Sequence, residues 1–489
     1  MKKLTKNSRV SLVELPPTQF GEYNGDPGYD IYTQFKMPSR AIPILTAILM
    51  NDDWRDVELI NPLYHGKNGR LTTENERRIF SSDALLASSI IRTSPQTMEL
   101  FRRYKSSNPN GISIAGGFDA TFRPEKYLEG GADIVVMGEG EKTLSELMKR
   151  LTQDQNELSG VRGIAYKGKN SEMIINEERE LMTTEELGKM PHPFYDERTR
   201  NIVRVATIET SRGCPMKCNF CSVTRFYREK YRIKPIEYVL EELRRIKGMG
   251  REIFFVDDNI AGNPKKTIEL SERVVSEGLT PKGITAQITA KAARNPELLA
   301  ALKRMGVKTL CLGIESLNDE TLKGLGKRTT AYENMEDIEI FEKEGIYTHD
   351  MTVVGGDGDT LKSLWWQEKW LKKHAGSLQI FPLTPTPGTE IYNKMKADGT
   401  LLTEDYSLYD GQMVVFRPKN MTPYELQKGI YEMYEDFYSP TAMAKRLLHS
   451  PRKTMQLGLF TYLYLMSGKK NLLYSPQALK HLEFLKSVS

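Results

Sequence analysis

The chain has 489 residues, of which 39% are hydrophobic and 27% are charged, and its four cysteines are too few for a disulfide framework. Its 69 basic and 64 acidic residues leave a net charge of +5, and we see no basic stripe interleaved with aromatic residues, so no nucleic-acid partner is expected. The composition is that of a soluble globular protein, and the length predicts at least two domains.

The two ends of the chain give no indication of a membrane anchor. The first residues, MKKLTKNSRVSLVEL, have neither a long apolar core nor a cleavage site, so we expect no signal peptide. The apolar run LGLFTYLYLM at 457–466 is too short to span a bilayer. We expect it to form a core helix, with contact to an apolar substrate or a membrane face as the alternative. The sequence predicts no transmembrane segment, and its reactive thiols favour the cytoplasm.

Residues 1–150 alternate short apolar runs with amphipathic segments. The expected strands are VSLVEL, VELINP, ISIAGG and IVVMG, and AIPILTAILM is an expected buried helix. Alternating strands and helices imply right-handed crossovers and a parallel sheet. This region is therefore predicted to be a doubly wound, Rossmann-like α/β domain.

Two glycine turns follow strands of this domain, GGFDAT at 116–121 and GEGEKT at 138–143. Ligands of open α/β sheets lie at the carboxyl ends of the strands. Glycine lets the backbone approach a ligand closely, and free N–H groups can meet the ligand's oxygens. The candidate binding residues are Gly116, Gly117, Asp119, Thr121, Gly138, Glu139, Gly140 and Thr143.

After a polar connector at 151–200, with a possible hairpin at GIAYKGKNSEMIIN, the alternation restarts. Helices are expected at PIEYVLEELRRIKGMG, PKKTIELSERVVSEG and NPELLAALKRMG, each ending on a glycine as expected of a C-cap. Six βα units predict a (βα)6 partial TIM barrel over 201–417, with its active site at the carboxyl ends of the strands. Residues 418–489 are expected to form a helical C-terminal region. The expected barrel strands are VRVATIET, EIFFVDD, GITAQIT, TLCLGIES, THDMTVVGG and SLQIFPL.

Three of the four cysteines lie on one loop, SRGCPMKCNFC at 211–221, directly after the first expected barrel strand. Thiolates are ligands for iron–sulfur clusters and for zinc. A structural zinc site takes four protein ligands, and the nearest histidines in sequence, His192 and His349, are far away. A distant fourth ligand keeps zinc open as the alternative. A cuboidal cluster held by Cys214, Cys218 and Cys221 would leave one iron free to bind a cofactor.

This loop resembles that of the radical SAM superfamily, whose members carry the same cysteine spacing with an aromatic residue before the last cysteine, here Phe220. The resemblance implies a [4Fe-4S] cluster on Cys214, Cys218 and Cys221, with S-adenosylmethionine chelating the fourth iron. It implies that an electron, from a donor such as flavodoxin or ferredoxin, cleaves the sulfonium to a 5′-deoxyadenosyl radical that abstracts hydrogen from the substrate.

Other barrel segments are similar to those of the same superfamily. FFVDDN corresponds to the segment that faces the methionine moiety, TAQIT and GIES to strand ends that bind the amine or the ribose hydroxyls, and VVGGDGDT to a glycine turn near the adenine. A carboxylate or amide suits a diol because it can accept both hydroxyl protons. The alternative for Asp257 and Glu315 is that they only cap helices. The implied cofactor-binding residues are Asp257, Asp258, Asn259, Gln287, Glu315 and Gly355.

Together with the barrel, the two glycine turns resemble those of the cobalamin-binding class of this superfamily, which has a doubly wound N-terminal domain. Phe118 and Asp119 replace the Pro-His pair that is usual in the first turn, and no Asp-x-His-x-x-Gly motif is present to ligate cobalt. Because the class commonly binds cobalamin without a protein histidine, the resemblance implies cobalamin as a further cofactor.

The leading hypothesis is an enzyme that methylates an unactivated carbon, with S-adenosylmethionine recharging the cobalamin and also supplying the radical. The second is a cobalamin-independent radical enzyme that forms a ring, oxidises or rearranges its substrate. The third is a non-enzymatic cobalamin or redox sensor, although no output module is recognisable. Aromatic residues near the C-terminus are compatible with a small-molecule or lipid-like substrate and equally with ordinary helix packing. The sequence names no general acid or base.

Overall fold

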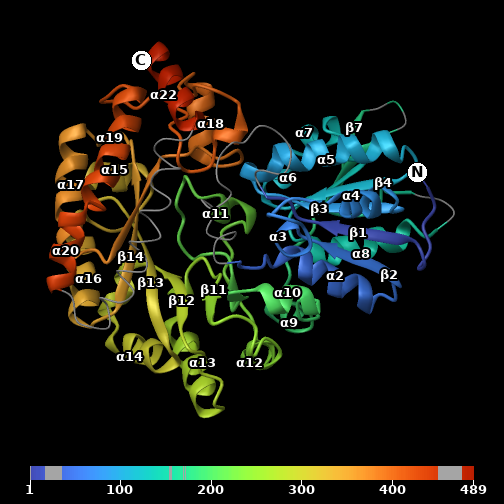
Figure 1. Cartoon of the computed structure of the whole chain (residues 1–489), viewed down its shortest axis with the longest axis horizontal. Helices are drawn as coiled ribbons and strands as arrows, with labels where there is room; N and C mark the ends of the chain where they lie inside the picture. Colours follow the sequence, from blue (N-terminus) through green and yellow to red (C-terminus); the bar gives the residue numbers. More distant parts are fainter. Residues whose placement is uncertain (1, 17–35, 154–156, 169, 171, 450–475) are drawn as a thin grey trace. The chain divides into compact units, whose positions relative to one another are not determined.

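The computed structural model describes residues 2–16, 36–153, 157–168, 170, 172–449 and 476–489 (Figure 1). Contacts within the chain divide it into two compact units, with the boundary between Thr207 and Ile208. Each unit has its own sheet and its own covering helices, so the two are described separately.

The first unit contains a seven-stranded sheet in the order β2-β1-β3-β4-β5-β6-β7. Strands β1 to β5 are parallel, and the order 2-1-3-4-5 places the topological switch point between β1 and β3. The predicted doubly wound domain is confirmed. The strands are β1 (Arg9–Val13), β2 (Asp56–Ile60), β3 (Ala84–Ser88), β4 (Ile112–Gly116), β5 (Ile134–Val136), β6 (Ile164–Lys167) and β7 (Met173–Ile175).

Helices cover both faces of this sheet because successive strand residues point to opposite sides. One core contains Leu12 with residues of α2 and α8, and the other contains Val13 with residues of α4, α5 and α7. The buried helix expected at 41–50 is α2. The helices of this part are α2 (Ala41–Asn51), α3 (Pro62–His65), α4 (Thr73–Phe80), α5 (Ser94–Ser107), α6 (Phe118–Phe122), α7 (Pro124–Glu129) and α8 (Gly140–Arg150).

The segment expected to be a connector adds to the first sheet. The hairpin forms as β6 and β7, and β6 pairs antiparallel with β5. Ile164 and Ala165 are fully buried in the two cores of the unit, so the hairpin is held by the same apolar packing as the parallel strands. Two short helices, α9 (Thr184–Gly188) and α10 (Glu197–Ile202), complete the first unit.

The second unit contains a six-stranded sheet in the order β15-β14-β13-β12-β11-β8. The registers from β11 to β15 are parallel, and the helices line the outer side of the sheet (Figure 1). The predicted partial barrel is confirmed. Its strands are β8 (Val205–Ile208), β11 (Glu252–Phe255), β12 (Ile284–Ile288), β13 (Val307–Glu315), β14 (Tyr347–Val354) and β15 (Ser377–Pro382).

The expected glycine C-caps hold for two of the three barrel helices. Gly306 ends α14 with φ of 100°, and Gly278 follows the end of α13 with φ of 65°, which is the left-handed conformation that glycine favours. The third prediction is wrong, because α12 ends at Arg245, before the two glycines. The outer helices are α12 (Ile236–Arg245), α13 (Pro264–Ser276), α14 (Pro296–Met305), α15 (Asp319–Gly324), α16 (Ala331–Lys343), α17 (Leu361–His374) and α18 (Glu390–Ala397).

The C-terminal region contains α19 (Pro423–Phe437), α20 (Pro440–His449) and α22 (Pro476–Val488). Strand β15 is an edge of the barrel sheet, and two tyrosines of this region occupy its free backbone groups. The Tyr434 hydroxyl accepts from the N–H of Ile380 and donates to its carbonyl, and Tyr438 does the same at Leu378. These aromatics therefore serve packing, the simpler interpretation of the sequence.

The apolar run at 457–466 lies outside the described residues. Within the described part of the chain, no helix has the length and apolarity needed to cross a membrane.

Candidate active site

The cysteine loop starts from a short antiparallel hairpin, β9 (Ser211–Arg212) with β10 (Arg232–Ile233). Gly213 follows with φ of 81°. A Cβ atom there would lie 2.2 Å from the carbonyl oxygen of Lys230, so only glycine fits at this close approach. The loop ends where α11 (Ser222–Phe226) begins directly after Cys221. Local backbone geometry therefore fixes both ends of the segment that carries the thiols.

The three thiols lie in mutual electrostatic contact and are largely shielded from water. Burial is the main cause that raises the pKa of Cys214 to about 11; Cys221, Asp258 and Cys218 act in the same direction, and the Met216 N–H opposes them. Burial likewise raises the pKa values of Cys218 and Cys221. A thiol with a raised pKa becomes a thiolate when a cation compensates its charge. The site is thus suited to a bound metal group rather than to free reactive thiolates.

Three cysteine ligands on one loop suit a cluster better than a single zinc ion. A mononuclear zinc site gathers four ligands around one point, whereas each thiolate of a cuboidal cluster binds a different iron. Backbone N–H groups of Val223 and Thr224 point to the sulfur of Cys221, and such hydrogen bonds tune iron–sulfur centres.

The segment after β11 contributes one acid toward the thiols and one that anchors the loop. Burial raises the pKa of Asp258 to about 7, helped by repulsion from Asp257 and Glu209, and Asp258 acts electrostatically on Cys214 and Cys221. Asp257 is 1% exposed. Its carboxylate accepts hydrogen bonds from the backbone and hydroxyl of Thr210 and from the hydroxyl of Ser211. Asp257 therefore holds the start of the cysteine loop.

Two other predicted residues, Asn259 and Gln287, form hydrogen bonds at the carboxyl ends of β11 and β12. The Asn259 side-chain oxygen Oδ1 accepts from the N–H groups of Ala261 and Thr289, at 3.2 and 3.4 Å, and so links the loops after β11 and β12. The Gln287 amide donates to the Asp257 carbonyl at 3.2 Å. These side chains shape the rim of the barrel through protein contacts.

Glu315 and Lys327 form a buried ion pair of 2.8 Å, with side-chain exposures of 13% and 9%. Glu315 has φ of 59°, a strained conformation for a non-glycine residue that is typical of functional sites. Burial lowers the pKa of Lys327, but Glu315 and the Cys218 thiol outweigh burial and raise it. Lys327 was not predicted. It joins the cysteine loop to the end of β13 and keeps a positive charge beside a thiol.

The glycine turn after β14 is held by its own acid. The Asp359 carboxylate accepts from the N–H groups of Gly355 and Gly356, at 2.9 and 3.1 Å, and from the Thr321 hydroxyl. A Cβ at Gly355 would lie 2.6 Å from the Leu426 side chain, so packing against α19 accounts for the glycine. The N–H groups of Gly355 and Gly356 are therefore occupied.

In the first unit the two predicted glycine turns lie side by side at the carboxyl ends of β4 and β5, which are paired. The Thr121 hydroxyl donates to the Gly117 carbonyl and accepts from the Gly138 N–H, so it joins one turn to the other. Gly138 has φ of 73°, and a Cβ there would meet no atom within 4 Å. The second turn thus presents bare backbone at Gly138, at the edge where such sheets bind ligands, which fits a large cofactor.

Asp119 does not present a free carboxylate. It is 4% exposed, and it accepts hydrogen bonds from the Arg123 guanidinium and from the Tyr127 hydroxyl at 2.7 Å. Ser89 and Ser94 extend this network. Because Arg123 is itself 5% exposed, the pair is a buried ion pair inside the first unit. Asp119 stabilises the turn rather than projecting from it.

Two further residues of the second turn also point into the protein. The Glu139 carboxylate accepts from the Met182 N–H at 2.7 Å, and the fully buried Thr143 hydroxyl accepts from Arg179 at 2.8 Å. Gly140 begins α8, and Gly116 ends β4. Of the residues predicted here, Gly138 leaves open space, Gly117 packs closely against the Ser89 carbonyl oxygen, and the polar side chains make internal bonds.

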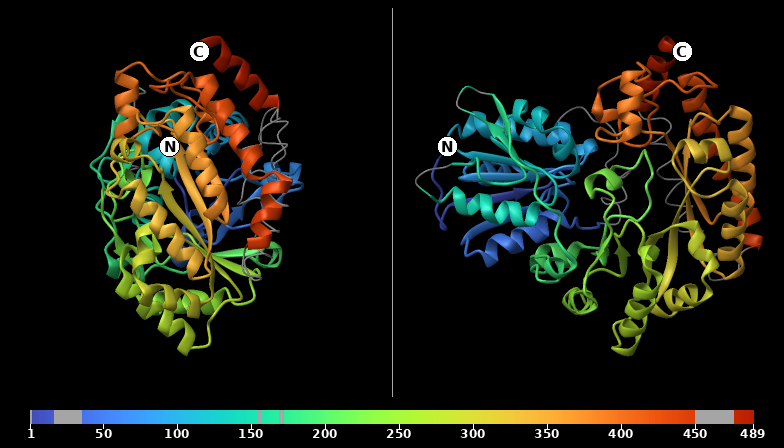
Figure 2. Two further views of the ribbon diagram at one scale, coloured as in Figure 1. Left: turned by 90° about the vertical axis from the view of Figure 1, so that its left-hand side faces the viewer. Right: turned by 180° about the vertical axis from the view of Figure 1, so that it is seen from behind.

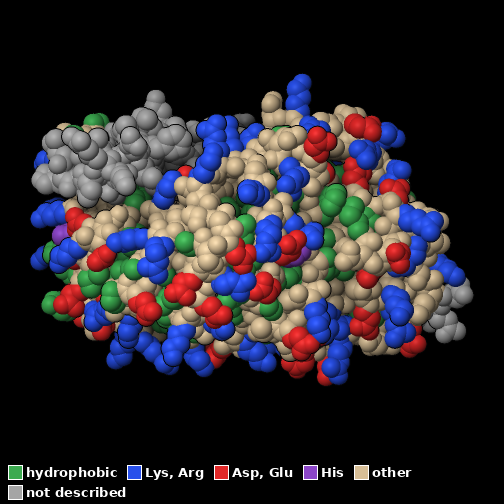
Figure 3. All heavy atoms as spheres, turned by 90° about the horizontal axis from the view of Figure 1, so that it is seen from below, with side chains coloured by type: hydrophobic (Ala, Val, Ile, Leu, Met, Phe, Trp, Pro, Cys, Tyr) green, Lys and Arg blue, Asp and Glu red, His purple; other side chains and the backbone are tan. Residues whose placement is uncertain are grey.

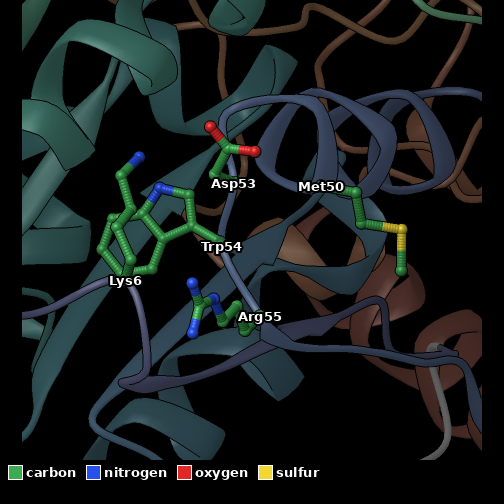
Figure 4. A pocket seen from close by; sticks show the side chains of 5 residues that line it. All are labelled: Lys6, Met50, Asp53, Trp54 and Arg55. Carbon is green, nitrogen blue, oxygen red and sulfur yellow. The ribbon is translucent and has the colours of Figure 1, made fainter.

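A hollow of about 520 Å³ lies elsewhere on this unit, lined by Lys6, Met50, Asp53, Trp54 and Arg55 (Figure 4). These residues precede β1 and β2, so the hollow lies at the amino ends of the strands, opposite the glycine turns. The Lys6 ammonium lies 5.0 Å from the Trp54 ring. This contact is local packing and adds nothing to the candidate site.

Two family models match the chain. The Radical SAM superfamily model matches residues 208–365, and the B12 binding domain model matches residues 31–148. The first match contains the cysteine loop, Glu315 and Lys327, and the second contains both glycine turns. Each family model therefore matches the unit in which the sequence motifs had indicated that family.

Curated relatives span the same regions. An uncharacterized methyltransferase of Pyrococcus horikoshii is 30% identical over 68% of this chain and 74% of its own length. An anaerobic magnesium-protoporphyrin IX monomethyl ester cyclase of Cereibacter sphaeroides is 29% identical over 70% of this chain, and a hopanoid C-3 methylase of Methylococcus capsulatus is 30% identical over 66%. The chain spans 57% and 62% of the length of these two relatives.

A solved structure shares the fold. The cobalamin-dependent S-adenosylmethionine radical enzyme OxsB, with aqua-cobalamin and S-adenosylmethionine bound, aligns with a TM-score of 0.69 over 99% of this chain and 75% of that one, at 17% identity. At this identity the likeness establishes the architecture alone.

Proposed function

The chain belongs to the radical SAM superfamily, in the class that also carries a cobalamin-binding domain, and on this basis we propose that it transfers a methyl group to an unactivated carbon. It is an enzyme whose cofactors are a [4Fe-4S] cluster, S-adenosylmethionine and cobalamin. One observation carries the proposal: a chain with the buried three-thiol loop also has two joined glycine turns, with bare backbone at Gly138, at the ligand-binding edge of a 2-1-3-4-5 sheet.

In such enzymes the cluster supplies reductive cleavage of S-adenosylmethionine, and cobalamin carries the methyl group. Cys214, Cys218 and Cys221 would hold the cluster. Lys327 would offset the negative charge of the thiolates, and with Glu315 it forms a rigid, water-poor wall at the barrel rim. The backbone of the two glycine turns would meet the corrin.

The residues in the site favour particular roles. Glu315 and Asp258 are the two acids that act electrostatically on the cysteines, and we propose them for the amine and ribose groups of S-adenosylmethionine. Asp257, Asn259, Gln287 and Gly355 are bonded within the protein, so we propose that they position the site without contacting the cofactor through their polar atoms.

The test is cobalamin retention by the anaerobically purified, cluster-reconstituted protein. Hydroxocobalamin is added, and the visible spectrum is recorded after gel filtration. Co-elution near one equivalent supports methyl transfer, and the matched variant Gly138→Val, which adds a branched side chain to the bare turn, is expected to lose it. If the unaltered protein also retains no cobalamin, the proposal is contradicted.

A second candidate is radical chemistry without methyl transfer, such as ring formation, oxidation or rearrangement. It is favoured by the similarity to a protein named as a cyclase. The two candidates separate if S-adenosylmethionine with a deuterated methyl group is supplied together with trial substrates. A product with the label supports methyl transfer, and an unlabelled product supports the alternative.

The enzyme needs a small-molecule substrate and a reductant. We propose a flavodoxin or ferredoxin as electron donor and the cytoplasm as location, where thiols stay reduced. The relatives include a hopanoid methylase and a protoporphyrin ester cyclase, so a polycyclic or lipid-like substrate is the class to test first.

A further inference from the structure

The chain has four tryptophans, and three of them lie on one outer helix of the barrel, α17. Trp366 is 51% exposed, and Trp365 and Trp370 are partly exposed. Tryptophan is usually well buried in a folded protein. Exposure of several on one helix therefore requires an explanation.

The exposed side of α17 also carries lysines. The helix packs inward through Leu364, Gln367, Glu368 and Leu371. At 100° per residue, the exposed Lys362, Lys369 and Lys373 fall on the opposite side together with Trp366, and Trp365 and Trp370 fall on the two flanks. We call this surface, formed by Trp365, Trp366, Trp370, Lys362, Lys369 and Lys373, the Trp–Lys face. Figure 2 (left) presents the side of the molecule that bears α17.

The three lysines of the Trp–Lys face form no ion pair with any described residue. By contrast, the neighbouring Lys372 pairs with Asp436 and His374 contacts Glu342. On the face drawn in Figure 3, basic and acidic side chains are interspersed. The Trp–Lys face thus combines uncompensated positive charge with exposed aromatic surface.

We propose that the Trp–Lys face is a docking surface for an anionic phospholipid bilayer. Tryptophan rings are favourable at the boundary between headgroups and acyl chains, and lysines extend from apolar surface to reach phosphate groups. A nucleic acid fits less well, because its recognition draws on arginine and on grooves or stacked bases. The proposal is independent of which reaction the enzyme performs.

The experiment uses the full chain, with the cluster reconstituted under anaerobic conditions, and sedimentation with vesicles. Binding is expected to vesicles of phosphatidylglycerol with phosphatidylcholine, to weaken with salt, and to be absent for phosphatidylcholine alone. The variant Lys362→Glu/Lys369→Glu/Lys373→Glu is expected to bind on the order of 100-fold more weakly. Trp366→Ala is expected to bind about tenfold more weakly.

The matched control is Lys265→Glu/Lys282→Glu/Lys291→Glu, which makes the same charge change at exposed lysines elsewhere on the second unit. It is expected to bind vesicles at least ten times more tightly than the α17 variant. All variants should form 5′-deoxyadenosine at the same rate in solution, which shows that they are folded. Equal binding by the two triple variants, no binding to anionic vesicles, or preferential binding to single-stranded RNA would each overturn the proposal.

Discussion

The cysteine loop of the barrel and the glycine turns of the first unit differ in which groups form the site: side chains in the loop and backbone in the turns. In the barrel, the thiols of Cys214, Cys218 and Cys221 and the acids Asp258 and Glu315 act on one another in a shared site. In the first unit, the polar side chains of the turns bond inward and leave backbone exposed. A site made of side chains can be identified in the sequence from the residue types of its motif. A site made of backbone can be identified only from its glycines.

The largest expected effect is at the cysteines. Cys218→Ala removes one of three cluster ligands, so iron and sulfide content should fall to background and formation of 5′-deoxyadenosine should stop. Both are measured after anaerobic reconstitution. Cys311→Ala is the control, because Cys311 lies in mid-strand on β13, away from the loop, and it should keep the cluster. Retained cleavage in Cys218→Ala would refute the cluster assignment.

The next largest effect is expected at Lys327, whose positive charge lies in the barrel site but outside the cysteine motif. Lys327→Met leaves the Glu315 carboxylate buried without its ion pair, and breaking a buried pair costs about 3–5 kcal/mol. We expect 5′-deoxyadenosine formation to fall on the order of 100-fold, with partial recovery in Lys327→Arg. Lys323→Met changes an exposed lysine of α15 and should behave like the unaltered enzyme. Normal turnover in Lys327→Met would show that the ion pair is dispensable.

The sequence predicted both sheets from local periodicity, and it predicted the cysteine loop and the two glycine turns from their motifs. That Thr121 joins one turn to the other is seen only in the structure. The sequence missed Lys327, because this residue meets Glu315 only after β13 ends and α15 turns the chain back. For the same reason the sequence did not predict that Asp359 bonds to Gly355 or that Thr210 bonds to Asp257. Sequence spacing does not record such contacts.

For Asp119, which was predicted to bind the cofactor, the sequence did contain a pattern that indicates an internal role. Asp119, Arg123 and Tyr127 are spaced by four residues, the separation that brings side chains together on a helix. That pattern favours an internal network over a ligand contact, and the structure shows the network across α6 and α7. A polar residue in a glycine motif is therefore best interpreted together with its partners one turn away.

The first unit offers the converse test, in which a motif residue should affect stability more than binding. Asp119→Asn leaves Arg123 buried without its counter-charge, so the free energy of unfolding of the first unit should fall by about 3 kcal/mol. Cobalamin retention, measured well below the unfolding transition, should change little. The control is Glu129→Gln at an exposed position of α7. Unchanged stability with lost cobalamin would instead make Asp119 a cofactor contact.

An acid of the barrel that lies outside the site should change only the pH dependence of stability. Asp350 is fully buried, and strand alternation places it on the side of β14 opposite His349. Burial raises the pKa of Asp350 to about 8 from 3.8. Between these two values the folded state keeps the proton and the unfolded state releases it, so stability falls as pH rises, by about 1.4 kcal/mol per pH unit.

Asp350→Asn keeps the shape and removes the proton. Relative to this variant, the unaltered protein should lose stability between about pH 4 and pH 8 and differ little in slope beyond that range, as measured by chemical unfolding of the second unit at several pH values. Asp398→Asn, at an exposed position after α18, should leave the pH profile unchanged. Because strand alternation places Asp350 on the face of β14 opposite His349, its replacement should also leave 5′-deoxyadenosine formation intact, and a loss of that activity would place Asp350 with the site instead.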